Sequence, residues 1–379
     1  MRIRTITAGA READLERAAA AAREARARLE ATGYDVQTLR LALLASGSNR
    51  CGDFTTIAQG VEAAALTAGF GYVSLGPLDG ARLERLPDAL AATETIFASA
   101  RIAGLDGAVY PDVIRAAAEA IVAIGAATPG GLGNMRFAAL AGVAPGSPFL
   151  PAAYHDGVAP WIAIGPEAAA LAMQATADCR LQNGDWGWQQ YAIYNLQSAI
   201  ETHDARIGAA LAGLEQETGV RFAGCDWSLA PHPDADRSIG AAIEALSGVP
   251  FGAWGTLAAV RSLTVAVRAA RVTRLGFSGV MLPVLEDATL ARRNTEGHYA
   301  LRDLLAFSAV CGTGLDTIPL PGDTTAEQIA GVLAEVAALS AALGKPLTAR
   351  LLPLPGLRAG EMTAFDNPYL VNTRVMPIA

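Results

Sequence analysis

Glycine, proline and ionisable residues gather most densely in the sequence CGTGLDTIPLPGD, from Cys311 to Asp323. The thiol of Cys311 can act as a nucleophile or an acid, and the carboxylates of Asp316 and Asp323 suit a hard cation such as Ca²⁺ or Mg²⁺. Gly312 and Gly314 let the backbone pass close to a ligand, so we expect both to contact substrate. The structural alternative stays open: Asp323 caps the next helix, Asp316 binds turn amides and Cys311 fills the core.

A second cluster ends the sequence GFSGVMLPVLED, where Glu286 and Asp287 follow a small and apolar run from Gly276 to Leu282. Ligands of α/β proteins collect at the carboxyl ends of strands. We therefore predict that Glu286 is a general base or a metal ligand. The alternative is a carboxylate in the first turn of a helix, where the helix dipole favours it.

Two further apolar runs end in polar residues. His155, in PAAYHDG, can titrate near neutral pH and is predicted to shuttle protons, although a hydrogen-bonded structural histidine is the alternative. Asp226 and Ser228, in CDWSLAP, follow a predicted strand directly. We assign Asp226 to catalysis and Ser228 to substrate binding, with turn initiation as the alternative role of Asp226.

Arginine must bind any anionic ligand, because Lys345 is the only lysine among the 29 basic residues. Its neighbours Gly344 and Pro346 predict a surface turn at the end of a helix. Arg4 is the predicted anion anchor, and Asn372 near the C-terminus is a further predicted substrate contact.

Short apolar runs alternate with alanine-rich helical segments along the chain, and this alternation is typical of βα units. The ten predicted strands are Ile3–Thr7, Leu39–Leu44, Tyr72–Leu75, Thr95–Ile102, Arg136–Ala141, Trp161–Ile164, Arg221–Ala223, Gly276–Leu282, Leu315–Leu320 and Leu347–Leu352. Helices are predicted over Glu12–Ala31, Pro111–Ala127, Gln189–Thr218, Gly255–Arg271 and Thr324–Leu343. The last has a capping box of Thr324 with Glu327 and ends at Gly344.

Composition limits the class of protein. The 379 residues are 52% apolar and 17% charged, which supports a large core, and no linker or internal repeat divides them, so we predict one domain over residues 1–379. The net charge of −8 and the lack of a basic cluster exclude nucleic acid as a partner. No run of about 18 apolar residues and no hydrophobic signal core is present, which predicts a cytoplasmic protein without a membrane segment.

Common cofactor motifs are missing from the sequence. The four cysteines, Cys51, Cys179, Cys225 and Cys311, form no CxxC pair, so neither a zinc site nor a disulfide framework is expected. No nucleotide-binding motif precedes Lys345, and its predicted surface turn is a poor place for a pyridoxal phosphate Schiff base.

Several of these motifs together resemble the DUF711 family, also called UPF0210, over nearly the whole chain. The similar stretches are Ile3–Thr7, Pro87–Glu94, Ser147–His155, Asp226–Pro231, Gly252–Thr256, Gly279–Asp287 and Cys311–Asp323. The resemblance implies a ten-stranded α/β barrel similar to that of pyruvate formate-lyase and other glycyl radical enzymes. Phe97 stands where the family is expected to have a cysteine, and the segment NTRVM at Asn372 lacks an RVxG-type glycine loop. No glycyl radical is therefore expected.

Together these features predict a non-radical enzyme that acts on a small polar or anionic metabolite inside the barrel. Thiol and carboxylate groups would supply acid–base chemistry, with or without a divalent metal, and lyase, isomerase and hydrolase reactions all stay open. The alternative is a non-catalytic regulatory protein that binds a small molecule or a metal. A homo-oligomer is expected in either case. Both hypotheses require Cys311, Glu286 and Asp316 to meet in one chamber.

Overall fold

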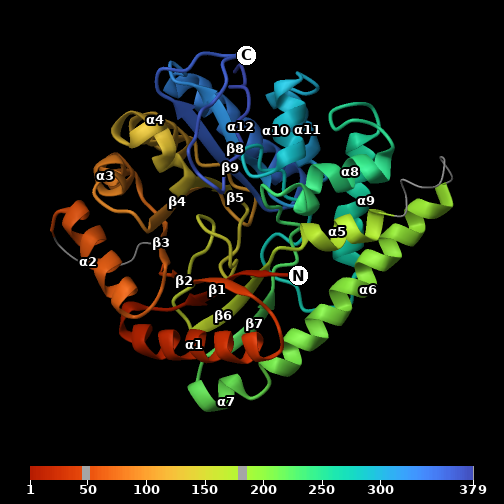
Figure 1. The fold of residues 1–379 in the computed structure, drawn as a ribbon. Helices are drawn as coiled ribbons and strands as arrows, with labels where there is room; N and C mark the ends of the chain where they lie inside the picture. Colours follow the sequence, from red (N-terminus) through yellow and green to blue (C-terminus); the bar gives the residue numbers. More distant parts are fainter. Residues whose placement is uncertain (45–51, 178–185, 379) are drawn as a thin grey trace.

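The computed structural model describes residues 1–44, 52–177 and 186–378, in which one nine-stranded sheet carries helices around its outer side (Figure 1). The strands are β1 (Ile3–Gly9), β2 (Val36–Ala42), β3 (Tyr72–Pro77), β4 (Ile96–Ala103), β5 (Phe137–Ala141), β6 (Trp161–Pro166), β7 (Arg221–Cys225), β8 (Gly314–Pro321) and β9 (Leu347–Leu354). The helices are α1 (Leu15–Ala31), α2 (Phe54–Thr67), α3 (Gly80–Ala91), α4 (Pro111–Ala127), α5 (Ala169–Thr176), α6 (Trp186–Ala210), α7 (Leu214–Thr218), α8 (Ile239–Ser247), α9 (Thr256–Ala269), α10 (Ala288–Thr295), α11 (Leu301–Ser308) and α12 (Ala326–Leu343).

Two groups of parallel strands make up the sheet, in the order β7-β6-β1-β2-β3-β4-β5-β9-β8. Strands β1 to β5 run parallel to one another. Strand β6 is antiparallel to β1 and parallel to β7, and β9 is antiparallel to β5 and parallel to β8. The mixed α/β class is therefore as predicted, and nine of the ten predicted strands are present.

The tenth predicted strand, residues 276–282, is an irregular segment, which differs from the prediction of ten regular strands. Gly276 and Ser278 have positive φ angles of 62° and 41°, and these conformations break the extended backbone that a ladder needs. Isolated parallel bridges still join the region from 274 to 283 to Cys225 and Leu229 on one side and to Asp316 on the other. This bridging segment thus touches both edges of the sheet, without a regular ladder that closes it.

The helix α12 shows how well the local signals place an element. Its apolar face is buried and packs against α4, and it ends at Gly344, which has a φ of 58° as a left-handed C-cap. The capping box lies one residue later than predicted, at Thr325 with Gln328, because the hydroxyl of Thr324 donates to the carbonyl of Pro321 (2.7 Å). Among the described residues, α12 alone has the length and apolar composition of a membrane-crossing helix.

Candidate functional site

The inner face of the sheet encloses a cavity of about 340 Å³, a volume within the range of small-molecule sites. Side chains from β1, β2, β3, β4, β5, β8 and β9 line it, together with the bridging segment. Its charged lining residues are Arg4, Arg40, Glu286, Asp316 and Arg350. Apolar and aromatic lining residues include Tyr72, Phe97, Phe149, Phe277 and Met281.

Strand geometry explains why polar side chains reach this cavity from apolar strands. Residues two apart in a strand project from the same face. Thr38 and Arg40 in β2, and Thr348 and Arg350 in β9, are two such pairs, and all four line the cavity. Each strand therefore presents polar residues inside while its other face packs against helices.

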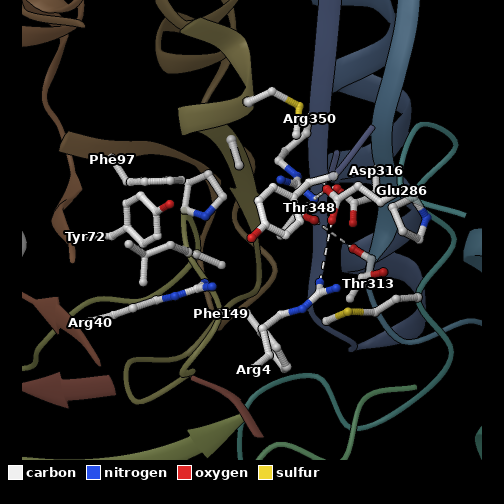
Figure 2. A pocket seen from close by; sticks show the side chains of 18 of the residues that line it. Arg4, Arg40, Tyr72, Phe97, Phe149, Glu286, Thr313, Asp316, Thr348 and Arg350 are labelled. Atoms are coloured by element: carbon white, nitrogen blue, oxygen red, sulfur yellow. Dashed lines mark hydrogen bonds and ion pairs between the residues drawn. The ribbon is translucent and has the colours of Figure 1, made fainter. Parts of the chain in front are cut away.

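Arg350 holds the two carboxyl groups of the cavity together (Figure 2). Its Nη2 donates to Oε1 of Glu286 at 2.8 Å, and its Nε donates to Oδ1 of Asp316. Burial lowers the pKa of Arg350, but the charges of Asp316 and Glu286 outweigh burial, so the net shift is upward. The guanidinium is therefore a permanent cation between two acids.

The two acids differ in their affinity for a proton. Burial raises the pKa of Glu286, but attraction to Arg350 and Arg4 outweighs it, and the net shift is downward. For Asp316 burial dominates and raises the pKa, against the opposing effect of Arg350. Glu286 is thus held as a carboxylate, whereas Asp316 is the acid that more readily keeps a proton.

Arg4 uses every part of its guanidinium to hold the surrounding chain. Nη2 donates to the carbonyl of Pro231, Nη1 lies 3.6 Å from Oε2 of Glu286, and Nε lies 3.6 Å from Oε1 of Glu167. Arg4 lines the cavity, and each of its three guanidinium nitrogens lies within 4 Å of a protein oxygen. It positions Glu286 more than it offers a free anion site.

Arg40 is a cavity residue that the sequence reasoning missed. Its Nε donates to Oγ1 of Thr38 at 2.9 Å, and its Cζ lies 5.6 Å from the centre of the Tyr72 ring. Burial, with repulsion from Arg4, lowers the pKa of Arg40 to about 10. The sequence does indicate this residue, because Arg40 is a cation inside the apolar run from Leu39 to Ala42. Arg350 is placed in the same way within β9.

Cys311 lies outside the cavity lining, in the core, with its side chain fully buried. Its Sγ accepts a hydrogen bond from the amide of Gly314 (3.2 Å). The nearby glycines serve close packing of the chain: a Cβ on Gly312 would lie 2.8 Å from the carbonyl carbon of Gly279, and one on Gly314 would lie 2.4 Å from the carbonyl oxygen of Thr348. The motif therefore reaches the cavity through Thr313 and Asp316, without its thiol.

Asp226 and Ser228 are buried outside the cavity lining and fix the start of the bridging segment. Oδ2 of Asp226 accepts from the amide of Phe277 (2.9 Å), and Oδ1 accepts from the amide of Ser278 (2.8 Å). Oδ1 also accepts from the amide and the hydroxyl of Ser228. Burial raises the pKa of Asp226, and these hydrogen bonds oppose the rise.

His155 and Asn372 also lie outside the cavity lining. Nδ1 of His155 accepts from the amide of Gly157 (2.6 Å), which leaves the Nε2 proton to donate to the carbonyl of Ala159 (3.2 Å). Burial lowers the pKa of His155, so the buried ring stays neutral. Asn372 is exposed and holds the C-terminal chain, where its Oδ1 accepts from the amide of Phe365 (2.7 Å).

The predicted metal pair, Asp316 and Asp323, does not converge. Asp323 is exposed beyond the end of β8, whereas Asp316 lies early in that strand and is bound by Arg350. Within the described ranges, no three side chains of His, Cys, Asp or Glu are grouped so that they could hold a metal ion. Lys345 differs from its prediction as a surface residue: it is buried, and its Nζ donates to the carbonyls of Ser308 (2.8 Å) and Cys311 (2.5 Å).

Sequence comparison places this α/β protein in a family. Residues 1–366 match the family described as uncharacterised ACR (DUF711), and the chain belongs to that family. It is 33% identical over 299 residues to a UPF0210 protein of Desulforudis audaxviator, a match that covers 77% of this chain and 65% of that protein. It is 31% identical over 315 residues to a UPF0210 protein of Pyrobaculum islandicum, covering 82% and 68%. The chain therefore spans about two thirds of the length of these relatives.

Proposed function

We propose that the chain is a non-radical enzyme that performs acid–base chemistry on a small anionic metabolite in the interior cavity. The observation that carries the proposal is the pair of Glu286 and Asp316, held by one arginine at the cavity wall with pKa values shifted apart. Paired acids with unequal proton affinities are a common arrangement for a base and an acid in one site. Glu286 would accept a proton from the substrate, and Asp316 would return one to the atom that gains electrons.

The charge of the cavity supports an anionic substrate. Three arginines line it against two carboxyl groups, which leaves a positive excess. Arg40 has no carboxylate within salt-bridge distance in the described part of the chain. The thiol of Cys311 has no role in this proposal because it does not line the cavity. A divalent metal also has no assigned role, and it stays a prediction.

The bridging segment supports a closed barrel as the setting of this chemistry. It contacts Cys225 at the end of β7, Leu229 just after that strand, and Asp316 in β8, through parallel bridges on both sides. We infer that it acts as the tenth strand of a barrel similar to that of glycyl radical enzymes. We also propose that this barrel is a single domain and that the protein is cytoplasmic. Strands β1 to β5 are one parallel group of five, and the bridging segment would complete a second group of five with β6, β7, β8 and β9, joined to the first at two antiparallel pairs.

A non-catalytic regulatory protein is the second candidate. One observation favours it: both carboxyl groups are already bonded to Arg350, which suits a preformed binding site as well as a reaction centre. The same cavity would then bind a small anion and transmit its presence to a partner or a second copy of the chain.

Turnover in D₂O containing H₂¹⁸O separates the two candidates, whichever acid–base reaction the enzyme performs. Pooled small carboxylic acids are incubated with the protein and analysed by mass spectrometry, since proton transfer at carbon adds deuterium and hydrolysis adds ¹⁸O. We expect a mass change that Glu286→Gln and Asp316→Asn each reduce by about 100-fold or more. Asp323→Asn, which removes an exposed carboxylate, is the matched control and should react as the wild type does. Binding without any mass change would instead identify the regulatory protein.

A further inference from the structure

The two terminal nitrogens of Arg40 make no hydrogen bond within the part of the chain that the structure describes. Its Nε is fixed by Thr38, whose hydroxyl in turn donates to the carbonyl of Arg4 (2.8 Å), so the guanidinium is positioned by its own strand and by β1. No hydrogen bond from Nη1 or Nη2 to another described residue exists. Two parallel N–H donors of this kind match the two oxygens of a carboxylate.

Thr313 provides an unsatisfied polar group at the cavity wall. The residue is 3% exposed and lines the cavity, and its Oγ1 has no hydrogen-bond partner within the described residues. A buried hydroxyl without a partner is unfavourable and is usually explained by a water or a ligand. Thr313 therefore marks a position where a bound molecule would place a hydroxyl or another polar atom.

These two groups lie on different walls of the cavity. Figure 2 shows Arg40 with Tyr72 and Phe97 on one wall, and Thr313 with Glu286, Asp316 and Arg350 on the other. The rings of Tyr72 and Phe97 contact each other edge to face, with centres 5.5 Å apart. A ligand that reaches from Arg40 to Thr313 thus has a charged end, an apolar middle and a polar end.

The charges around Thr313 indicate which polar group the ligand has at that end. The wall of Thr313 also holds Arg350, with Arg4 beside Glu286, so an ammonium group there would approach two cations. A neutral hydroxyl avoids this repulsion and can donate to Glu286 while it bonds to Thr313. The carboxylate at the other end reduces the positive excess of the lining.

We propose that the substrate is a small hydroxycarboxylate, with its carboxylate on the terminal nitrogens of Arg40 and its hydroxyl bonded to Thr313 and Glu286. This inference rests on the proposed function and specifies the substrate class of the same cavity. The hydroxyl would donate a hydrogen bond to the carboxylate of Glu286 and stay neutral, which positions the substrate beside Glu286 and Asp316 for the proposed acid–base reaction.

A matched set of four-carbon probes tests this substrate class by titration calorimetry on the whole protein. The set contains 2-, 3- and 4-hydroxybutyrate, the corresponding aminobutyrates, butyrate without a hydroxyl, and 1,3-butanediol without a carboxylate. We expect one hydroxybutyrate to bind about tenfold or more tightly than butyrate, the matching aminobutyrate and the diol. An aminobutyrate that binds as tightly as the hydroxybutyrate overturns the proposal.

Two variants assign the two ends of the ligand. Arg40→Gln should weaken binding of the hydroxybutyrate by at least about tenfold and leave the weak binding of the diol unchanged. Thr313→Val should reduce hydroxybutyrate binding to the level of butyrate, and its thermal midpoint should equal or exceed that of the wild type because a buried unsatisfied hydroxyl is removed. Arg206→Gln is the control, since Arg206 also lies over a tyrosine ring, that of Tyr34 (5.1 Å), but outside the cavity lining.

The outcomes separate this inference from the proposed function. Isotope incorporation that depends on Glu286 while Arg40→Gln has no effect on hydroxybutyrate binding would refute the hydroxycarboxylate and leave the acid–base enzyme standing. Hydroxybutyrate binding that depends on Arg40 and Thr313, without isotope incorporation into any of the pooled acids, would support the ligand class and refute the enzyme.

Discussion

Glu286 and Asp316 accept hydrogen bonds from the same guanidinium, that of Arg350, although they lie 30 positions apart in the sequence. Glu286 comes from the chain that follows the bridging segment, and Asp316 comes from β8. Their pKa values shift in opposite directions. Burial raises both pKa values, but attraction to Arg350 and Arg4 outweighs it for Glu286, whereas for Asp316 burial, together with repulsion from Glu286, outweighs the arginines. This difference predicts opposite effects of two similar substitutions on stability.

Glu286→Gln should lower the free energy of unfolding at pH 7 by about 3 kcal/mol, because it removes a charge that two buried arginines require. Asp316→Asn should leave stability unchanged or raise it slightly, because burial disfavours the ionised form of Asp316 and the amide cannot ionise. Urea unfolding at pH 7 measures both. If Asp316→Asn proves as destabilising as Glu286→Gln, Asp316 is as firmly ionised as Glu286 and cannot be the proton donor.

The stability of the wild type should fall in acid partly through Glu286. Its folded-state pKa is lower than the ordinary value of 4.5, so its contribution is complete above that pH and is lost as pH falls through the lowered value. Glu286→Gln should therefore lose less stability than the wild type between pH 5 and pH 3. Urea midpoints across this range provide the measurement, and parallel curves for the two proteins would contradict the lowered pKa.

Asp226 should act through the position of the bridging segment. Asp226→Asn replaces one acceptor oxygen with an amide NH₂ that faces backbone N–H donors, which should cost about 2 kcal/mol of unfolding free energy. Amide hydrogen exchange should also become faster at Phe277 and Ser278. The exposed Asp323→Asn is the control and should change stability by about 0.5 kcal/mol or less. Unchanged exchange at both amides would show that other contacts fix the segment.

Local sequence signals predicted the regular elements well. The range of α4 is as predicted, and the left-handed glycine at Gly344 ends α12, because capping and turn preferences act over a few residues. The predicted helix over 189–218 is divided where Gly213, with a φ of 80°, separates α6 from α7. The segment over 276–282 has the composition of a strand, but its positive φ angles are fixed by distant bonds to Asp226.

The candidate site was predicted only in part, because its residues are far apart in the sequence and meet only through the register of the sheet. Arg4, Glu286 and Asp316 reach the cavity as expected, whereas Cys311 and His155 have equally suggestive neighbours and lie outside its lining. The register of the sheet decides which side chains at the end of a strand face inward. A shift of one residue turns each of them to the opposite face. Arg40 and Arg350 are cations within apolar strands and do line the cavity, whereas Arg101 in β4 has the same setting and lies outside the lining.

Cys311 should be dispensable for ligand binding. Cys311→Ala should retain the hydroxybutyrate affinity and the isotope incorporation of the wild type, although the lost sulfur leaves a small gap in the core that costs about 1 kcal/mol. Peptide-resolved alkylation should label Cys311 as slowly as Cys225, which is equally buried. If Cys311 is labelled rapidly and a hydroxybutyrate blocks the labelling, the thiol does face the cavity and this prediction is wrong.

His155 should stabilise the fold as a neutral ring. Burial lowers its pKa, so protonation favours the unfolded state, and its contribution is present above the ordinary value of 6.5 and is lost as pH falls toward the lowered folded-state value. His155→Asn keeps an acceptor for the amide of Gly157 but cannot be protonated. We expect it to be less stable than the wild type by about 1 to 2 kcal/mol at pH 8, with a gap that narrows toward pH 5.

Urea unfolding of both proteins at pH 8, 6.5 and 5 measures that gap, and the imidazole C2 proton of His155 should titrate below pH 6.5 in the wild type. His298→Asn is the control for loss of an imidazole, since His298 lies in an exposed turn beside Glu296, with their side chains 3.3 Å apart. A gap that widens as pH falls would mean that the folded state favours the imidazolium form of His155. Because the ring is bonded within its own loop from Gly157 to Ala159, isotope incorporation by His155→Asn should match that of the wild type wherever the variant is folded.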